Sequence, residues 1–203
     1  MAHPERQARE HAIQALCEAG AVPAATTQAL QLYGVELLGF LRALAHDHDL
    51  AAEAFAELSE DIWKGLGKFR WQASLRSWLY QLARNALAQL RRDPRRRADR
   101  NLPLSSAPEL AAVVRTVTID IQRTEVKDEL RLLREQLDPE EHELLLLRLD
   151  RGLAWKDIAR IVHGGDAQLD VRAAALRKRF ERAKDRLRKL AAASGLLDRA
   201  ELR

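Results

Sequence analysis

The chain has 203 residues and a formal net charge of +4, and 47% of its residues are hydrophobic. That length and apolar content are sufficient for one domain or for two small ones, each with a buried core. The single cysteine, Cys17, excludes an internal disulfide and a cysteine-based zinc site, and we expect a small buried side chain there. Because no apolar run could span a bilayer and Met1 to Gly20 lacks the apolar core of a signal peptide, we expect a cytoplasmic protein.

Leu and Ala dominate the sequence, whereas Val, Ile and Thr are sparse and alternating apolar and polar residues are nearly absent. A sheet has little to be built from, so we predict an all-α fold. The only β-leaning patch lies between Val113 and Ile121 and is too short to form a sheet. Basic residues cluster in two segments, Arg84 to Arg100 and Arg172 to Lys189, and such clusters favour local contacts with phosphates.

The N-terminal part of the chain is Ala-rich and weakly patterned, so we treat residues 1–24 as an extension with a short helix from about Glu5 to Ala19. A clear helical period begins at Thr26 and ends at His46-Asp47-His48-Asp49. The alternating His and Asp residues leave two interpretations, a metal site or a solvated turn leading into an N-cap at Asp49, and we favour the turn. The apolar face of this helix carries Leu30, Tyr33, Leu37, Phe40, Leu41 and Leu44.

A second helix is predicted from Leu50 to Leu66, with an apolar face and an acidic face. The apolar face carries Ala54, Phe55, Leu58, Ile62 and Leu66. The other side carries Glu53, Glu57, Glu60 and Asp61. Without further information, an acidic side of this kind indicates a solvated charged surface.

The next helix is the element around which the chain is organised. Its apolar residues recur at three- and four-residue steps and predict a buried stripe of Leu75, Trp78, Leu79, Leu82, Ala86 and Leu90. Ser74 can cap the first turn, but the third helical position lacks the Glu or Gln of a full capping box. The outward face of this helix is basic.

The loop before this helix alternates cations and aromatic rings from Lys68 to Trp71, after two glycines, Gly65 and Gly67, that are free to bend the backbone. Aromatic faces stack on unpaired bases and cations bind phosphates, so this composition is typical of single-stranded nucleic-acid binding. The alternative is that Phe69, Trp71 and Trp78 belong to the core, and for Trp78, which lies on the apolar stripe, we favour the core.

Residues 93–108 contain three prolines, a run of arginines and two serines, which indicates a linker and a domain boundary. The second domain opens near Arg123 with a helix through Leu137. Asp138-Pro139 then predicts a capped helix start, with Asp at the cap and Pro at the first helical position. A short helix over Leu153 to Val162 and a long basic helix from Val171 to Ala193 complete the chain.

A short helix, a glycine-containing turn and a long basic helix indicate a helix-turn-helix, whose second helix would lie in the major groove of duplex DNA. Alternatively, an Arg/Lys-rich C-terminal helix is only a solvated surface. The candidate DNA contacts on the second helix are Arg172, Arg177, Lys178, Arg179, Arg182 and Arg186.

Two segments resemble one known family. Arg76-Ser-Trp-Leu-Tyr-Gln-Leu-Ala-Arg-Asn85, followed by Leu90-Arg-Arg92, is similar to the promoter-melting segment of the extracytoplasmic-function sigma factors of bacterial RNA polymerase. The residues from Leu153 to Ala159 and from Lys178 to Ala183 resemble the family's helix-turn-helix. The chain departs from the family at Ala154, where a capping Ser or Thr is usual, and in a longer turn from His163 to Arg172.

The resemblance implies a two-domain promoter-specificity subunit. Residues 25–93 would be region 2, residues 94–122 the linker and residues 123–203 the region 4 helix-turn-helix that binds the minus-thirty-five element. The implied partners are promoter DNA and the beta and beta-prime subunits of core RNA polymerase, and an anti-sigma factor is left open. The resemblance implies contacts with single-stranded minus-ten DNA for Lys68, Phe69, Arg70, Trp71, Ser74, Arg76, Arg84, Asn85, Arg91 and Arg92.

The acidic side of the second helix also acquires a role from the resemblance, because the matching helix of the family docks on a basic coiled coil of the largest polymerase subunit. Glu53, Glu57, Glu60 and Asp61 would then contact polymerase. The chain departs from the family here, since Ser59-Glu60-Asp61 stands where an aromatic and a basic residue are common.

Two other functions are alternatives to a sigma factor. A regulator that binds duplex DNA without polymerase would leave the loop from Phe69 to Trp71 unexplained. An enzyme such as a nuclease lacks clustered carboxylates, a Ser/His/Asp arrangement and a phosphate-cradling loop in the sequence. The histidines are expected in turns or on exposed faces, namely His46, His48, His142 and His163. We therefore expect no catalytic residue, no cofactor and no metal, and a protein that associates with the nucleoid when bound to polymerase.

Limited proteolysis should cut the chain between Leu90 and Glu109 and leave two helical fragments, because this segment combines prolines with a run of arginines. Mass spectrometry of the products checks this. A single protected fragment spanning residues 85–125 would contradict the two-domain organisation.

Overall fold

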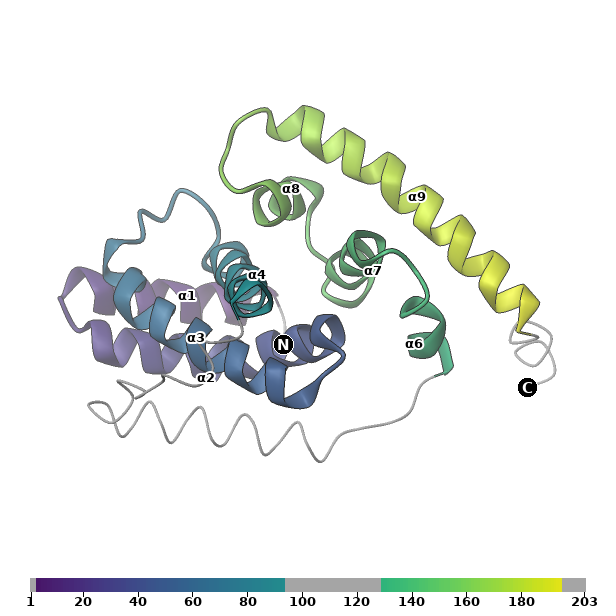
Figure 1. Cartoon of the computed structure of the whole chain (residues 1–203). Helices are drawn as coiled ribbons and strands as arrows, with labels where there is room; N and C mark the ends of the chain where they lie inside the picture. The colour runs from purple at the N-terminus through teal and green to yellow at the C-terminus, as the bar shows by residue number, and fades with distance from the viewer. Residues whose placement is uncertain (1–2, 94–128, 195–203) are drawn as a thin grey trace. The chain divides into compact units, whose positions relative to one another are not determined.

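The computed structural model describes residues 3–93 and 129–194, and all regular structure in these ranges is helical (Figure 1), which confirms the all-α prediction. The chain divides into two compact units, Met1–Glu125 and Val126–Arg203. The predicted linker and the β-leaning patch lie outside the described residues. The limits predicted for the domains stay predictions.

The first unit is a bundle of α1 (His3–Glu18), α2 (Val22–Ala45), α3 (His48–Gly65) and α4 (Leu75–Arg92), with the short 3-10 turn η1 (Leu66–Lys68) after α3. Helix α2 packs against α1, α3 and α4, and α3 also packs against α4. The apolar faces predicted for α2 and α3 are buried in this core apart from Leu44, which is half-buried. The spacing of apolar residues in these two helices therefore predicted which faces are buried.

Helix α1 is more closely integrated than its weak pattern indicated. Ile13 is fully buried, and the hydroxyl of Tyr33 on α2 donates a hydrogen bond to Glu10 Oε1. Burial, and then this hydrogen bond, raises the pKa of Tyr33 above its ordinary value. Cys17 lies half-buried on the same helix, where burial raises the pKa of the thiol and so disfavours the reactive thiolate.

The junction between α2 and α3 differs from the prediction by two residues, because Asp47 and not Asp49 is the N-cap. His46 adopts a left-handed conformation at φ 55°, which ends α2 and leaves Asp47 extended. Asp47 Oδ1 then accepts hydrogen bonds from the backbone N–H groups of Asp49 at 2.9 Å and Leu50 at 3.0 Å. Among the residues that the structure describes, no group of three His, Cys, Asp or Glu side chains could hold a metal ion.

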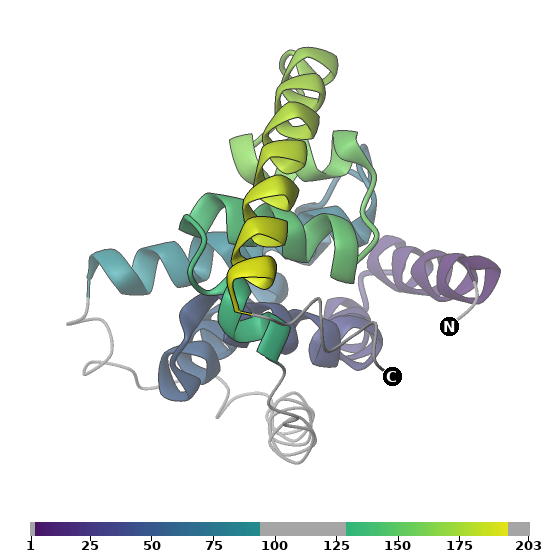
Figure 2. The same ribbon diagram turned by 90° about the vertical axis from the view of Figure 1, so that its right-hand side faces the viewer.

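The second unit contains α6 (Glu129–Arg134), α7 (Pro139–Leu145), the π-helical turn η4 (Leu146–Asp150), α8 (Trp155–His163) and α9 (Leu169–Ala193). The long helix α9 packs against α6, α7 and α8 (Figure 2). Its buried residues are Ala173, Leu176, Phe180, Ala183 and Ala191.

Helix α7 begins as predicted, with Asp138 Oδ1 accepting a hydrogen bond from the N–H of Glu140 at 3.0 Å and Pro139 in the first turn. His142 was expected in a turn or on an exposed face. This prediction is wrong, because His142 is only 3% exposed. This short helix packs along α9 and continues into η4, so its polar residues Glu141, His142 and Glu143 become buried.

The turn of the helix-turn-helix is shorter than predicted. Helix α9 begins at Leu169, so the turn spans residues 164–168, and left-handed conformations at Gly164, Gly165 and Gln168 close it. Arg160 Nε donates to Asp166 Oδ1 at 2.6 Å, and this hydrogen bond raises the pKa of Arg160. Ala154 is the N-cap of α8 and makes no side-chain cap bond, as predicted.

Within residues 3–93 and 129–194, no helix combines the length and the apolar character needed to cross a membrane.

Replacing Asp47 by Ala should lower the free energy of unfolding by about 1 kcal/mol, because two N–H groups of the first turn of α3 lose their acceptor. Asp47→Asn is the matched control and should retain most of the stability, since Asn caps equally well. Thermal and urea unfolding measure both variants. Asp49 also interacts favourably with the dipole of α3, and high salt screens this interaction. If Asp49→Ala lowered the stability more than Asp47→Ala at high salt, the assignment of Asp47 as the cap would be wrong.

Candidate nucleic-acid interface

Helix α4 is rotated relative to the stripe that its sequence predicted. Trp78 and Leu82 were predicted to lie in the core, and both are only half-buried. The side of α4 that is buried consists of Leu75, Ser77, Leu79, Tyr80, Ala83, Ala86, Leu87 and Leu90. The prediction was wrong because a period of apolar residues does not distinguish a core position from the wall of a cleft.

A polar contact with α2 accompanies this rotation. The carboxylate of Glu36 accepts hydrogen bonds from Arg76 Nε at 2.7 Å and from the hydroxyl of Tyr80 at 2.8 Å, and Arg76 Nη2 lies 2.5 Å from the same oxygen. The Arg76 side chain is 14% exposed. These bonds hold the Arg76 and Tyr80 side of α4 against α2, and they engage Arg76 inside the bundle.

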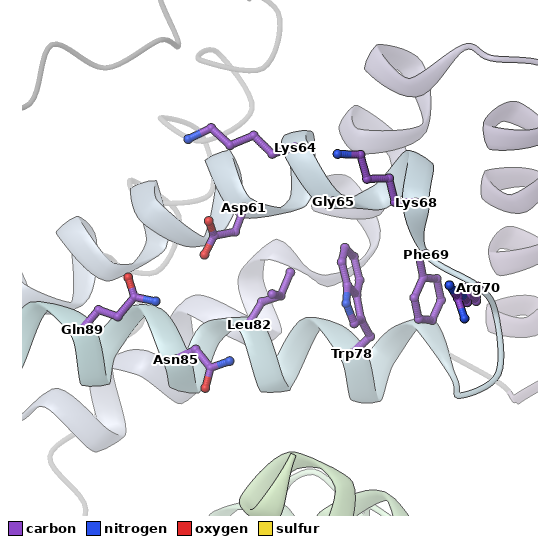
Figure 3. A pocket seen from close by; sticks show the side chains of 10 residues that line it. All are labelled: Asp61, Lys64, Gly65, Lys68, Phe69, Arg70, Trp78, Leu82, Asn85 and Gln89. Carbon is purple, nitrogen blue, oxygen red and sulfur yellow. The ribbon is translucent and has the colours of Figure 1, made fainter. Parts of the chain in front are cut away.

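The half-buried side chains open onto a cleft of about 530 Å³ between α3, α4 and the turn that joins them (Figure 3). Trp78 points from α4 toward α3, with Leu82, Asn85 and Gln89 following it along the same helix. The cleft is lined by Asp61, Lys64, Gly65, Lys68, Phe69, Arg70, Trp78, Leu82, Asn85 and Gln89.

Aromatic rings form one end of the cleft. The rings of Phe69 and Trp78 stack with centroids 4.8 Å apart at an interplanar angle of 23°, and the ring of Trp71 lies 5.0 Å from that of Phe69 at 57°. All three residues are half-buried, so part of each remains accessible. Flat accessible rings of this kind are platforms for unpaired bases.

The two glycines before the loop allow close packing and not the backbone bend that we expected. Neither adopts a positive φ. A Cβ at Gly65 would lie 3.1 Å from Cζ2 of Trp78, and a Cβ at Gly67 would lie 3.0 Å from Cγ2 of Val22. Gly65 therefore makes room for the Trp78 ring, and Gly67 allows η1 to pack against the start of α2.

The bend of the loop occurs instead at Trp71, whose φ of 56° lies in the left-handed region. A residue with a side chain is strained in this conformation by about 1 to 2 kcal/mol relative to its ordinary backbone. Strained residues of this kind cluster at functional sites, and Trp71 is part of the aromatic cluster.

The structure brings together four of the residues predicted for single-stranded DNA, namely Lys68, Phe69, Arg70 and Asn85, in the lining of the cleft. Trp71 joins them through its contact with Phe69. Lys68, Arg70 and Asn85 are exposed; the two cations lie at the aromatic end of the cleft, and Asn85 lies about two turns of α4 beyond Trp78 (Figure 3).

Other residues predicted for this site have contacts within the bundle. Ser74 Oγ accepts a hydrogen bond from the N–H of Ser77 at 3.1 Å and so caps α4, as predicted. Arg91 Nη2 donates to the carbonyl oxygen of Leu44 at 2.5 Å, and Arg92 Nε donates to that of Ala88 at 3.2 Å. Arg84 is half-buried. Their DNA contacts stay predictions.

The prediction missed part of the cleft wall. The missed residues are Trp78, Leu82 and Gln89, which share one face of α4 with the predicted Asn85, because the four recur at steps of four, three and four residues. This mixture of an aromatic, an aliphatic and two amide side chains at helical spacing could have indicated a binding surface. Gly65 is recognisable only from the structure, because its role depends on the ring that packs against it.

The residues predicted to contact polymerase do not form one uniform surface. Glu53 and Glu57 are half-buried on α3. Glu60 forms an ion pair with Lys64 at 3.0 Å, and Asp61 lines the cleft. Asp61 therefore lies beside the cations Lys64 and Lys68, where it lowers the positive potential of one wall.

The basic residues of α9 lie on different sides of the helix. Arg179 forms ion pairs with Asp138 and Glu140, and Arg186 Nη1 lies 2.8 Å from Glu141 Oε2, so these two arginines contact the start of α7. Arg172 is half-buried on the same side.

Arg177 lies on the opposite flank of α9. Its guanidinium carbon is 5.7 Å from the ring centroid of Trp155, which also lies 5.1 Å from Arg148 and packs edge-on against Phe180. The remaining two predicted residues, Lys178 and Arg182, are exposed on the outward face.

Comparison with known proteins identifies the first unit. Residues 30–97 match the family model described as Sigma-70 region 2, and this part of the chain contains every residue that lines the cleft. The fold is similar to a chain in the co-crystal structure of the sigma factor RpoE in complex with the anti-sigma factor NepR from Bartonella quintana. That similarity has a TM-score of 0.57 at 18% identity and covers 81% of this chain and 95% of that chain. No curated protein matches the sequence.

The matched segment and its cleft define a sigma-70 region 2 domain. The match to sigma-70 region 2 and the similarity in fold to a sigma factor support an RNA polymerase sigma factor. Sigma factors are in general regulators without enzymatic activity. A regulator that binds duplex DNA without polymerase is not favoured, since it would have no need of a region 2 domain.

Trp71→Gly should be more stable than Trp71→Ala by about 0.5 to 1 kcal/mol, because both variants lose the ring but only Gly adopts a left-handed φ without strain. Urea unfolding measures the difference. The neighbouring exposed residue Gln72, which has no positive φ, is the matched control, and there the Ala variant should be at least as stable as the Gly variant. Equal stability of Trp71→Gly and Trp71→Ala would show that the loop is unstrained.

Proposed function

We propose that the cleft beside Phe69 and Trp78 captures an unpaired base of the minus-ten element while this sigma factor directs core polymerase to its promoters. The observation that carries the proposal is the stacked pair of accessible rings, 4.8 Å apart, next to Lys68 and Arg70. The rings supply a surface on which a base can stack, and the cations supply contacts for the flanking phosphates. Asn85 supplies hydrogen-bond groups for the edge of the base.

The energetics are compatible with DNA melting. Extruding one base from a duplex costs a few kcal/mol, and stacking on an aromatic side chain returns about 1 to 3 kcal/mol per base. Contacts of the base edge and the phosphates supply the remainder. The cleft would therefore stabilise a strand that is already separated more than it would stabilise a paired duplex.

The second unit would bind the upstream, minus-thirty-five element as duplex DNA. Helices α8 and α9 form the helix-turn-helix that supports this role, and α9 would lie in the major groove. Lys178 and Arg182 on its outward face would contact bases and phosphates. In this proposal residues 25–93 act as region 2, residues 123–203 as region 4, and residues 94–122 as the linker.

Core polymerase would bind the acidic side of α3, with Glu53 and Glu57 as the principal contacts to a basic surface. Polymerase would supply the active site and its metal, so we propose that this chain catalyses no reaction. A cytoplasmic location follows, because polymerase and promoter lie there. An anti-sigma factor is a further proposed partner, since the RpoE structure contains one.

Phe69→Ala and Trp71→Ala should leave closed-complex formation on a fully paired promoter intact and should abolish strand opening. Each loses a ring that stacks only on an exposed base, at a loss of about 1 to 3 kcal/mol per base. Permanganate footprinting of unpaired thymines measures opening, and a gel shift measures duplex binding. A template with a pre-melted minus-ten bubble should restore part of the transcription, because the base no longer has to be unpaired.

Lys178→Ala and Arg182→Ala are the reciprocal controls and should weaken duplex binding without altering the response to the bubble. If the loop variants open the promoter normally, or if they lose duplex binding, Phe69 and Trp71 have only a structural role and the proposal is wrong.

A further inference from the structure

The outward face of α9 changes from aliphatic to basic along the helix. With 3.6 residues per turn, Val171, Ala174, Ala175, Lys178 and Arg182 share one side of α9. All five are exposed, and Val171 is 68% exposed, the largest value among the large apolar residues that the structure describes. The buried residues Ala173, Leu176 and Phe180 lie on the opposite side.

The other cations near the first two turns of this face lie on its flanks, and Arg172 in the first turn is half-buried on the flank of Arg179 and Arg186. Arg179 and Arg186 are directed to the acidic start of α7, and Arg177 lies against Trp155. A partner that approaches the outward face near the N-terminus of α9 therefore meets aliphatic side chains first. Charged groups follow one turn later, at Lys178.

Ion pairs link α8 to the start of α9 and to the turn before it. Lys156 Nζ on α8 lies 2.9 Å from Asp170 Oδ1, and Arg160 holds Asp166 in the turn. In this motif the N-terminal residues of the second helix contact base edges in the major groove. On those edges the single apolar group is the C5-methyl of thymine, which aliphatic side chains contact.

We propose that Val171, supported by Ala174 and Ala175, recognises the C5-methyl group of a thymine in the upstream element. This inference rests on the proposed binding of α9 to duplex DNA and adds a base preference to it. Val171 is then a specificity-determining residue, and Lys178 and Arg182 supply affinity on the next turns. The contact buries an aliphatic side chain that is otherwise exposed to water.

Replacement of thymine by deoxyuridine tests the contact, because it removes the methyl group and retains every hydrogen-bonding atom of the base. The probe is a duplex selected from a randomised pool by the full chain bound to core polymerase. Deoxyuridine at one or two upstream positions should weaken closed-complex binding by about fourfold, equivalent to about 0.8 kcal/mol.

Most of the advantage of the same thymine over deoxyuridine should be lost in Val171→Ala, so that the effects of the two changes are not additive. The substitution does not threaten folding, since Val171 is exposed and Ala is the better helix former. Leu149→Ala is the matched control, because Leu149 is an aliphatic residue outside α9 and is 49% exposed. Leu149→Ala should retain the full preference for thymine over deoxyuridine.

Lys178→Ala and Arg182→Ala separate the two possible failures. If neither weakens closed-complex binding, the duplex proposal itself fails. If they weaken binding while deoxyuridine has no effect at any upstream thymine, or while discrimination survives Val171→Ala, the methyl contact is overturned and duplex binding stands. A selected upstream element without thymine also overturns the methyl contact.

Discussion

The contact of Glu36 with Arg76 and Tyr80 decides which side of α4 faces the core, and the cleft depends on that choice. One carboxylate accepts hydrogen bonds from two residues one turn apart, with both ion-pair side chains less than one-fifth exposed. Hydrogen bonds to a charged group in such surroundings contribute about 1.5 to 3 kcal/mol. Since these bonds draw one side of α4 toward α2, Trp78 and Leu82 are left beside α3, where they form the wall of the cleft and not a core layer.

The cleft also departs from the local preferences of its own residues. Trp71 adopts a backbone conformation that suits glycine, and Gly65 occupies a helical position where most residues would be more favourable. Both departures allow the aromatic cluster to form, because Gly65 accommodates the Trp78 ring and the bend at Trp71 sets its ring near Phe69. Functional sites commonly retain such local conflicts, which the packing of the surrounding bundle stabilises.

Local rules predicted the caps at Ser74 and Asp138, because such a cap depends only on the neighbouring backbone, although they placed the cap of α3 two residues too late. Local rules failed where contacts between distant parts of the chain determine which side chains are buried. The apolar period could not separate Trp78 in the cleft from Leu79 in the core, since both side chains are hydrophobic. The engagement of Arg179 was equally hidden, because its acidic partners on α7 lie far away in sequence. The fold class and the loop composition were thus accessible from sequence, and the cleft wall was not.

The ion pairs between α9 and α7 have a consequence for counterions. A DNA duplex releases condensed cations in proportion to the number of phosphates that a protein neutralises. In a plot of the logarithm of the binding constant against the logarithm of the salt concentration, each neutralised phosphate makes the slope more negative by about 0.9. Arg179 and Arg186 are already paired with carboxylates, so neither brings a full unneutralised charge to a phosphate. In the proposed complex with upstream duplex DNA, the salt dependence would therefore be shallower than the number of basic residues in α9 implies.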